Sequence, residues 1–313
     1  MHNAAAALND AGIPDGKRLL DEAATYREDI LKAFTEAMQR TPVVKLRDGS
    51  WIPHIPPDVH RRGRTFGWIT ETLEGPIHIV ACGILEPWDR RSTWIMKDYE
   101  DNLCISEQYG FPLTGEEYER YWFSRGAVSI QPNLLWMVPY LLRDEPKHFL
   151  RTYFNGFAMC YFPDTRMMTE WVRKLGIAAG DHYKSSDEAN SAYWLRLMFI
   201  QERGDELWLG AAIPRYWLAD GNKIGIENAR TYFGPMSVKF ESMADKGKII
   251  MNLVTPRRNP PKKIFVRFRH PDGKQMTRCE IDGKAYKNFD PEKEWVILTD
   301  CPEKTTRITA YYN

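Results

Sequence analysis

Apolar residues recur at helical spacing through the first part of the chain. Between residues 17 and 40 this pattern comprises Leu19, Ala23, Ile30, Phe34 and Met38, which fall along one side of a helix. The same spacing predicts further helices over residues 68–85, 91–102, 134–142, 147–161 and 187–201. Because the connections between successive helices are short, we expect antiparallel helical hairpins stacked side by side.

After Gly204 the period of the pattern changes from about 3.6 residues to about 2. Short β-rich runs follow at 238–240, 264–269, 276–281, 295–298 and 307–311, separated by Asp-Gly and Lys-Gly turns. The clearest predicted hairpin pairs residues 237–242 with 249–254. The sequence therefore predicts an α+β fold of two domains: a helical domain over residues 1–203, with almost no strand, and an antiparallel β-sandwich over residues 204–313.

The charge balance and the length of the apolar runs exclude two kinds of partner, nucleic acid and membranes. The 43 Lys and Arg residues face 42 Asp and Glu residues, so there is no basic field to attract nucleic acid. No run of about 20 apolar residues suits a membrane span. Residues 1–16 lack the basic start and apolar run of a secretion signal. We therefore expect a cytoplasmic protein, or a secreted or periplasmic one if a leader precedes this chain.

Cysteine and histidine spacing gives no metal signature. The five cysteines form no CxxC pair, and His54, His60 and His78 are isolated from one another. We expect free thiols, no metal and no other cofactor.

Aromatic residues make up 13% of the chain, including 11 Trp and 15 Tyr, and most of them precede residue 220. Indole and phenol rings combine an apolar face with a polar edge. Such rings either pack a large core or line a cleft in which they stack on sugar faces.

Several short motifs come in a familiar order. They are Trp122-Phe123-Ser124-Arg125-Gly126, Gln131-Pro132-Asn133-Leu134, Leu150-Arg151-Thr152-Tyr153-Phe154-Asn155, Lys184-Ser185-Ser186-Asp187-Glu188, Ile213-Pro214-Arg215-Tyr216-Trp217-Leu218 and Thr231-Tyr232-Phe233-Gly234-Pro235-Met236-Ser237. From about residue 17 onward, this order resembles the C-terminal half of bacterial six-hairpin, (α/α)6-toroid glycoside hydrolase-like proteins, in which a β-sandwich follows the toroid. The resemblance implies a role in carbohydrate metabolism.

The helices expected here would make up about half of such a toroid. The resemblance therefore implies a partial (α/α) toroid: a fragment, a split-gene product or a compact variant. A partial toroid leaves helix faces uncovered, and large apolar patches seldom stay exposed on a monomer. We accordingly expect self-association into a homo-oligomer.

Glycoside hydrolysis requires two carboxyl groups, one on each side of the scissile bond. Carboxylates close to predicted loops are therefore candidates: Glu74, Glu100, Asp101, Glu107, Glu170 and Asp187. Glu170 is the preferred general acid, because its apolar neighbours would desolvate it and raise its pKa. Glu107, in a polar and aromatic stretch, is its preferred catalytic partner. Asp187 also fits a capping box that opens at Ser185.

Glu100 and Asp101 end a predicted helix, where a carboxylate opposes the helix dipole. Their position predicts either a local polar network or a contact with a ligand.

Other residue types suit sugar binding. Arg125 and Arg151 stand among aromatic residues, where each could grip a ligand or serve as an ordinary salt-bridge partner. Tyr121 and Trp122 offer stacking faces, and Gln131 and Asn133 offer side-chain amides. His182 and Lys184 precede a predicted helix start that could meet an anionic group such as a uronate.

Three functions follow from these features. A glycoside hydrolase-like protein that binds or acts on a poly- or oligosaccharide is favoured. The second hypothesis is a polysaccharide lyase, which would neutralise a uronate and abstract a proton. The third is a non-catalytic fragment that binds sugar or assembles with a partner.

Overall fold

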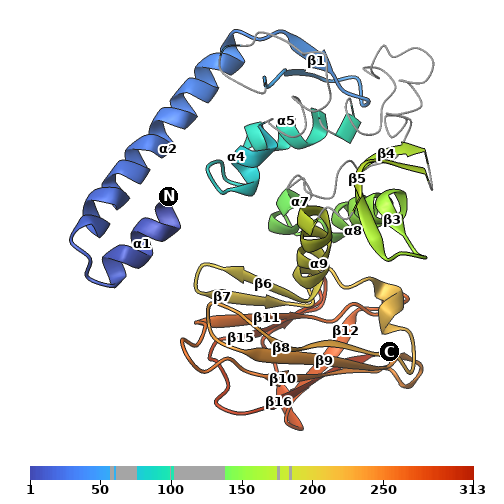
Figure 1. Cartoon of the computed structure of the whole chain (residues 1–313). Helices are drawn as coiled ribbons and strands as arrows, with labels where there is room; N and C mark the ends of the chain where they lie inside the picture. The colour runs from blue at the N-terminus through green and yellow to red at the C-terminus, as the bar shows by residue number, and fades with distance from the viewer. Residues whose placement is uncertain (57–59, 61–75, 99, 102–137, 175–176, 183–184) are drawn as a thin grey trace. The chain divides into compact units, whose positions relative to one another are not determined.

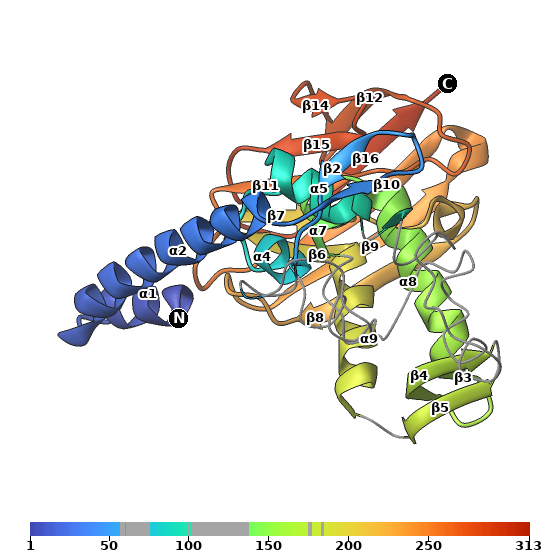
Figure 2. The same cartoon turned by 90° about the horizontal axis from the view of Figure 1, so that it is seen from above.

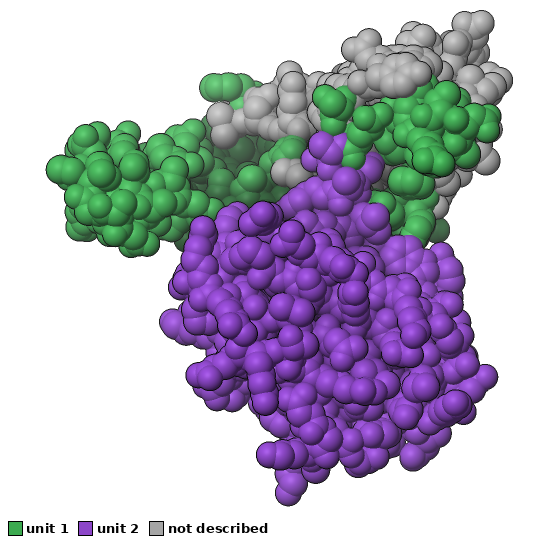
Figure 3. Space-filling view, turned by 60° about the horizontal axis from the view of Figure 1, so that its bottom comes forward, with its two compact units in different colours: residues 1–188 green, residues 189–313 purple. Residues whose placement is uncertain are grey.

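The computed structural model describes residues 1–56, 60, 76–98, 100–101, 138–174, 177–182 and 185–313 (Figure 1). The chain divides into two compact units, residues 1–188 and residues 189–313, which Figure 3 colours separately. In the ranges given above, no helix combines the length and the apolar character that crossing a membrane requires.

The helices of unit 1 follow the predicted pattern where they are described. They are α1 (His2–Asp10), α2 (Asp15–Gln39), α4 (Ile77–Ala81), α5 (Arg90–Asp98), α7 (Val138–Leu142) and α8 (Pro146–Cys160). The apolar stripe that predicts α2 is the side that the helix buries, including Ala23, Phe34 and Met38. Pro146 in the first turn of α8 suits a helix start, because proline lacks the N–H that this position leaves unpaired.

An additional short helix, α1, forms a hairpin with α2 (Figure 1). The two helices approach so closely that a Cβ atom on Gly16 would lie 2.3 Å from the backbone nitrogen of Asn9. Glycine is therefore required at this position for steric reasons.

Unit 1 also contains strands, so the prediction of almost no strand before residue 200 is wrong. A small hairpin joins β1 (Val43–Lys45) to β2 (Trp51–Pro53). A second antiparallel sheet comprises β3 (Tyr161–Phe162), β4 (Met167–Lys174) and β5 (Ile177–His182), and β4 contacts α8 (Figure 2). The cause is local, because the backbone becomes extended at Tyr161 directly after α8, and the residues that follow include strand formers such as Trp171 and Val172.

Unit 2 contains α9 (Ser185–Phe199), whose first residues belong to unit 1, and two sheets. The six-stranded sheet has the order β13-β12-β16-β10-β9-β8, and every neighbouring pair in it is antiparallel. Its strands are β8 (Lys223–Ala229), β9 (Met236–Met243), β10 (Lys248–Val254), β12 (Met276–Ile281), β13 (Lys284–Tyr286) and β16 (Thr306–Tyr312). The predicted hairpin is confirmed, since β9 pairs with β10 with Ser242 opposite Ile249.

The five-stranded sheet has the order β14-β15-β11-β7-β6. Its strands are β6 (Ile200–Arg203), β7 (Glu206–Leu209), β11 (Lys263–Arg267), β14 (Phe289–Asp290) and β15 (Trp295–Leu298). Its neighbouring pairs are antiparallel except for β7 and β11, which run parallel. With helices and mainly antiparallel sheets together, the fold is α+β.

Apolar side chains join the two sheets of unit 2. Phe240 of β9 meets Phe268, just after β11, with ring centroids 5.8 Å apart. A Cβ on Gly210, just after β7, would lie 3.0 Å from the ring of Phe240. Both phenylalanine side chains are almost fully buried. The core of unit 2 therefore lies where these sheets contact each other.

A buried carboxylate fastens a short 3-10 turn, η4 (Arg215–Leu218), to the five-stranded sheet. The guanidinium of Arg215 donates two hydrogen bonds to Glu294, at 2.7 and 3.0 Å, and one to the carbonyl of His270 at 2.8 Å. The Arg267 Nε atom lies 3.7 Å from the same carboxylate, whose side chain is 7% exposed.

We predict that Glu294→Gln lowers the free energy of unfolding by about 3 kcal/mol, because it leaves two guanidinium groups without a buried counter-charge. Urea unfolding followed by circular dichroism measures the change. Glu227→Gln is the matched control, since it removes a pair with Lys239 in which both side chains are exposed. That pair should contribute less than about 1 kcal/mol. Equal effects of the two substitutions would contradict the prediction.

Candidate functional site

Three carboxylates cluster at the C-terminal end of α5, each with a partner in unit 1. Asp98 lies 3.5 Å from Nδ1 of His54, and Asp101 accepts a hydrogen bond from the backbone N–H of Arg47 at 3.0 Å. Glu100 makes the most contacts of the three. Carboxylates at this end of a helix face the negative end of its dipole, so they need such partners. The predicted polar network at residues 100 and 101 is confirmed.

Helices α7 and α8 supply the groups that hold Glu100. The hydroxyl of Tyr140 donates to Oε2 at 2.7 Å, and Nη2 of Arg151 donates to Oε1 at 2.5 Å. Nδ1 of His148 lies 3.3 Å from Oε2 and 3.1 Å from Nη2 of Arg151. We call Glu100, Tyr140, His148 and Arg151 the Glu100 network.

The turn between α7 and α8 explains how these side chains meet. Asp144 adopts the left-handed conformation with φ of 57°, and α8 begins two residues later. The rings of Tyr140 and His148 then stack with centroids 5.1 Å apart. His148 and Arg151 are three residues apart in α8, which places them on one side of that helix.

Opposing effects act on the pKa of Glu100. Burial of the carboxyl group raises its pKa, but hydrogen bonds from Tyr140 and Arg151 and the charges of Arg151 and His148 outweigh burial and lower it. The group is therefore a carboxylate at neutral pH. It can accept hydrogen bonds from hydroxyl groups or act as a base or nucleophile, but it cannot act as a general acid there.

The side chains of this cluster differ in how far they are exposed to solvent. The side chain of Glu100 is 18% exposed, whereas those of His148 and Arg151 are 43% and 38% exposed. His54 and Asp98 are almost fully buried. A ligand can thus reach the imidazole of His148 and the guanidinium of Arg151. The buried pair of His54 and Asp98 instead stabilises the C-terminal end of α5.

The structure places only part of the predicted site. Arg151 belongs to the Glu100 network. Glu170 lies in β4 and His182 in β5, and Thr169 pairs with His182, so the two predicted residues share one hairpin. The other predicted site residues lie outside the described ranges: Glu107, Tyr121, Trp122, Arg125, Gln131, Asn133 and Lys184. Their roles, and that of Glu170, stay predictions.

Sequence reasoning missed Tyr140 and His148. The spacing of His148 and Arg151 on a predicted helix was a usable signal. The contact of Tyr140 with Glu100 spans 40 residues and has no local signal. Across the part of the chain that the structure describes, no group of three His, Cys, Asp or Glu side chains is arranged to hold a metal ion.

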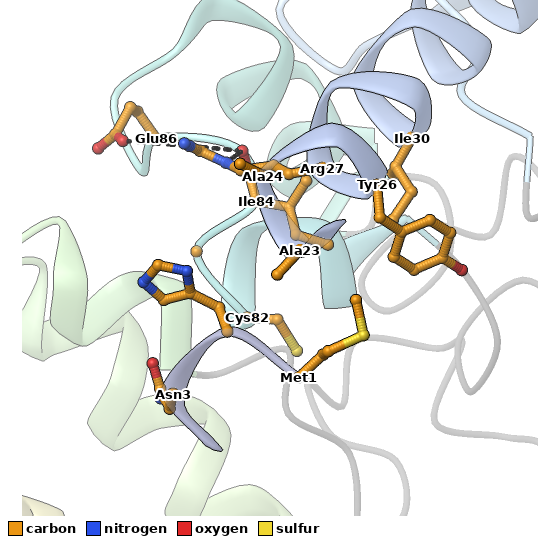
Figure 4. Close-up of a pocket in the computed structure, with 12 residues that line it drawn as sticks. Met1, Asn3, Ala23, Ala24, Tyr26, Arg27, Ile30, Cys82, Ile84 and Glu86 are labelled. Carbon is orange, nitrogen blue, oxygen red and sulfur yellow. Dashed lines mark hydrogen bonds and ion pairs between the residues drawn. The ribbon is translucent and has the colours of Figure 1, made fainter. Parts of the chain in front are cut away.

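A separate hollow of about 570 Å³ in unit 1 lies among α1, α2 and the segment after α4 (Figure 4). Arg27 reaches across it and donates to the carbonyl of Ile84 at 3.0 and 3.2 Å, with Glu86 at 3.7 Å. The charge of Arg27 thus serves to join α2 to this segment. Among the described residues that line the hollow, none is a predicted site residue.

Comparisons with known proteins give distant likenesses. No family model matches the chain, and no curated protein matches it. Among solved structures, an α-L-rhamnosidase from Dictyoglumus thermophilum is similar over 78% of this chain, with 9% identity and a TM-score of 0.40. A GH127 β-L-arabinofuranosidase from Geobacillus stearothermophilus T6 is similar over 57%, with 10% identity and a TM-score of 0.31.

A protein described as a glycoside hydrolase is likewise similar over 57% of the chain, with 8% identity and a TM-score of 0.31. The matched regions cover 30%, 25% and 32% of the arabinofuranosidase, the rhamnosidase and this third protein, respectively. These likenesses are too distant to assign an activity.

The lowered pKa of Glu100 predicts how the free energy of unfolding depends on pH. A group whose pKa is lower in the folded state contributes stability that is complete above its unfolded value, near 4.5, and is lost as the pH falls through the folded value. We expect Glu100→Gln to lower the free energy of unfolding by about 1–2 kcal/mol at neutral pH, because three polar partners lose a carboxylate. This difference should shrink as the pH falls below the unfolded value and through the lower folded pKa.

Urea unfolding at neutral and acidic pH measures this difference. Glu22→Gln, on the exposed face of α2, is the control and should show little effect at either pH. A Glu100→Gln effect that stays constant with pH would contradict the prediction.

Proposed function

We propose that this chain is a carbohydrate-active protein of the glycoside hydrolase-like type, which binds or acts on a poly- or oligosaccharide. The observation that carries the proposal is the Glu100 network. Its ionised carboxylate, imidazole and forked guanidinium lie within 3.3 Å of one another at a partly exposed position. Sugar hydroxyls both donate and accept hydrogen bonds, and such a group of side chains offers them both kinds of partner.

The proposal extends to the architecture. We infer that the helices within residues 1–203 form part of an (α/α) toroid, and that residues 204–313, together with β6 (Ile200–Arg203), form the β-sandwich that follows it. The α1–α2 hairpin and the contacts between the two sheets support this inference, together with the resemblance in motif order. Strands β3–β5 would be an insertion among the helices.

The proposed hydrolysis assigns the role of base or nucleophile and the role of general acid to different carboxyl groups. Because Glu100 is held ionised, it suits the role of base, nucleophile or acceptor of sugar hydroxyls. The general acid must then be another group, and Glu170 remains our proposal for it, with Glu107 as a second carboxylate. Arg151 would orient the sugar while it balances the charge of Glu100.

The charge of Glu100 also distinguishes between the alternatives. If a polysaccharide lyase used Arg151 to neutralise a uronate, the Glu100 carboxylate 2.5 Å from Arg151 would repel that uronate. Arg125, the arginine expected in that role, lies outside the described residues. A non-catalytic sugar-binding role is favoured by a different fact, namely that both oxygens of Glu100 already have partners. Binding without turnover is therefore the second candidate function.

Assays on a panel of soluble polysaccharides test the proposal. A hydrolase releases reducing ends without ultraviolet absorbance, whereas a lyase product absorbs as an unsaturated uronate. We expect hydrolysis, with at least about a hundredfold lower rate for Glu170→Gln and Glu107→Gln, because each removes a carboxyl group that transfers a proton or attacks. Glu22→Gln should retain the wild-type rate.

Retention of polysaccharide without any product would favour the binding role. Unsaturated products would establish the lyase. Unchanged turnover and binding in Glu170→Gln, Glu107→Gln and Glu100→Gln would show that the site is wrongly assigned.

A further inference from the structure

Unit 2 carries a hollow of about 610 Å³ on its surface, separate from the Glu100 network. Helix α9 contributes Leu195 and Phe199, η4 contributes Trp217, and residues 222–225 contribute Asn222 and the start of β8. We propose that this hollow binds a neutral sugar chain, with Trp217 as the stacking platform. The choice of a sugar as ligand rests on the proposed function, but the site lies in the other unit and needs no catalysis.

Two of the residues that line the hollow, Phe199 and Trp217, are aromatic, and Tyr216 adjoins Trp217 without lining it. The ring of Trp217 lies roughly parallel to that of Phe199, with centroids 6.3 Å apart. Tyr216, which is 66% exposed, meets Trp217 edge to face at 6.3 Å. Trp217 itself is partly exposed. The apolar face of its indole suits the C–H face of a sugar ring.

Both ends of η4 are fixed, so Trp217 is held in place before any ligand arrives. Arg215 is bound to the buried Glu294 through two hydrogen bonds, at 2.7 and 3.0 Å. At the other end, the hydroxyl of buried Ser242 donates to the carbonyl of Leu218 at 2.6 Å. A side chain that is already ordered loses less entropy on binding, which raises the affinity that one ring can provide.

The polar groups at the hollow favour a neutral ligand. Asn222 is exposed, and the nitrogen of its side-chain amide donates to the carbonyl of Tyr216 at 3.4 Å, so its side-chain oxygen is the group that can accept from a sugar hydroxyl. Its backbone carbonyl accepts a hydrogen bond from Ser242 at 2.9 Å. The ammonium of Lys223 lies 3.1 Å from Glu241, so its charge is already balanced. Because β8 is the outer strand of its sheet, backbone groups on the side away from β9 can also meet hydroxyls.

The same outer strand is a poor place for an added peptide strand. The pairing of β8 with β9 shifts register between Ile226 and Ala229, which interrupts a regular edge. The strand also carries charged side chains at Lys223, which lines the hollow, and at Glu227. Bulges and edge charges are features that prevent pairing between sheet edges. A sugar chain therefore fits this surface better than a peptide or a second copy of the chain.

Affinity gel electrophoresis of the full chain tests the proposal, with gels containing xylan, galactomannan, arabinan or β-glucan. We expect at least one of these polymers to retard the wild-type chain. Trp217→Ala should weaken this binding by about tenfold or more, as truncation of a central aromatic anchor does. Asn222→Ala should weaken it about fivefold, because it removes the amide oxygen that accepts from the sugar and the hydrogen bond to the carbonyl of Tyr216 in η4.

Tyr232→Ala is the matched control, because Tyr232 is 73% exposed in the same unit but does not line the hollow. It should bind as the wild type does, and circular dichroism should show that all variants are folded. Wild-type retention by Trp217→Ala and Asn222→Ala would overturn the proposal. So would the absence of retardation by every neutral polymer, or retardation by polygalacturonate alone. A change in oligomeric state without a change in retardation would show a protein interface instead.

The catalytic variants separate this inference from the proposed function. Glu170→Gln and Glu100→Gln should keep the Trp217-dependent retardation even when turnover is lost. If they lose turnover while Trp217→Ala binds normally, the hollow is wrongly assigned and the hydrolase proposal stands. If Trp217→Ala loses retardation and no variant or wild-type chain shows turnover, the sugar site stands and the hydrolase proposal fails.

Discussion

A carboxylate that folding removes from water must find partners, and Glu294 shows how much of unit 2 follows from this requirement. It precedes β15 and binds Arg215, which is 79 residues earlier in the chain, as well as Arg267 at the end of β11. One ionised group thus joins η4, β11 and β15. The turn that carries Trp217 has its position because Glu294 needs counter-charges.

Glu100 in unit 1 meets the same requirement with a different result. Its partners come from helices α7 and α8, and the side chains of two of them, His148 and Arg151, remain well exposed. The arrangement at Glu294 is closed and stabilises the fold, whereas the arrangement at Glu100 leaves a guanidinium and an imidazole accessible to a ligand. The residue types around Glu294 and Glu100 are similar. What makes Glu100 a candidate binding site and Glu294 a structural ion pair is the greater exposure of the partners of Glu100.

Regular periodicity made α2, α8 and the β9–β10 hairpin predictable, because each buries one side against its own unit. The polar network at Glu100 was also foreseeable, because acidic residues at a helix end conflict with the dipole. Arg151 was among the predicted site residues, and the spacing of His148 from Arg151 on one helix was a usable signal. No local signal predicts the contact of Tyr140 with Glu100, which spans 40 residues. Strands β3–β5 were missed because the prediction treats residues 162–186 as the connection between the helices at 147–161 and 187–201, inside a domain expected to be helical. The pairing of His54 with Asp98 likewise spans 44 positions without a shared motif.

The parallel pairing of β7 with β11 has a consequence for how unit 2 folds. Residues 210–262 lie between these two strands and contain the antiparallel succession β8, β9 and β10. Neighbouring strands of that succession close short loops, whereas β7 and β11 must close a long one, at a greater cost in chain entropy. Strands β8, β9 and β10 can therefore pair early through local contacts. The five-stranded sheet is complete only after β7 has paired with β11. The pairing of β7 with β11 should accordingly be the step that limits the folding rate of unit 2, rather than the formation of the hairpins.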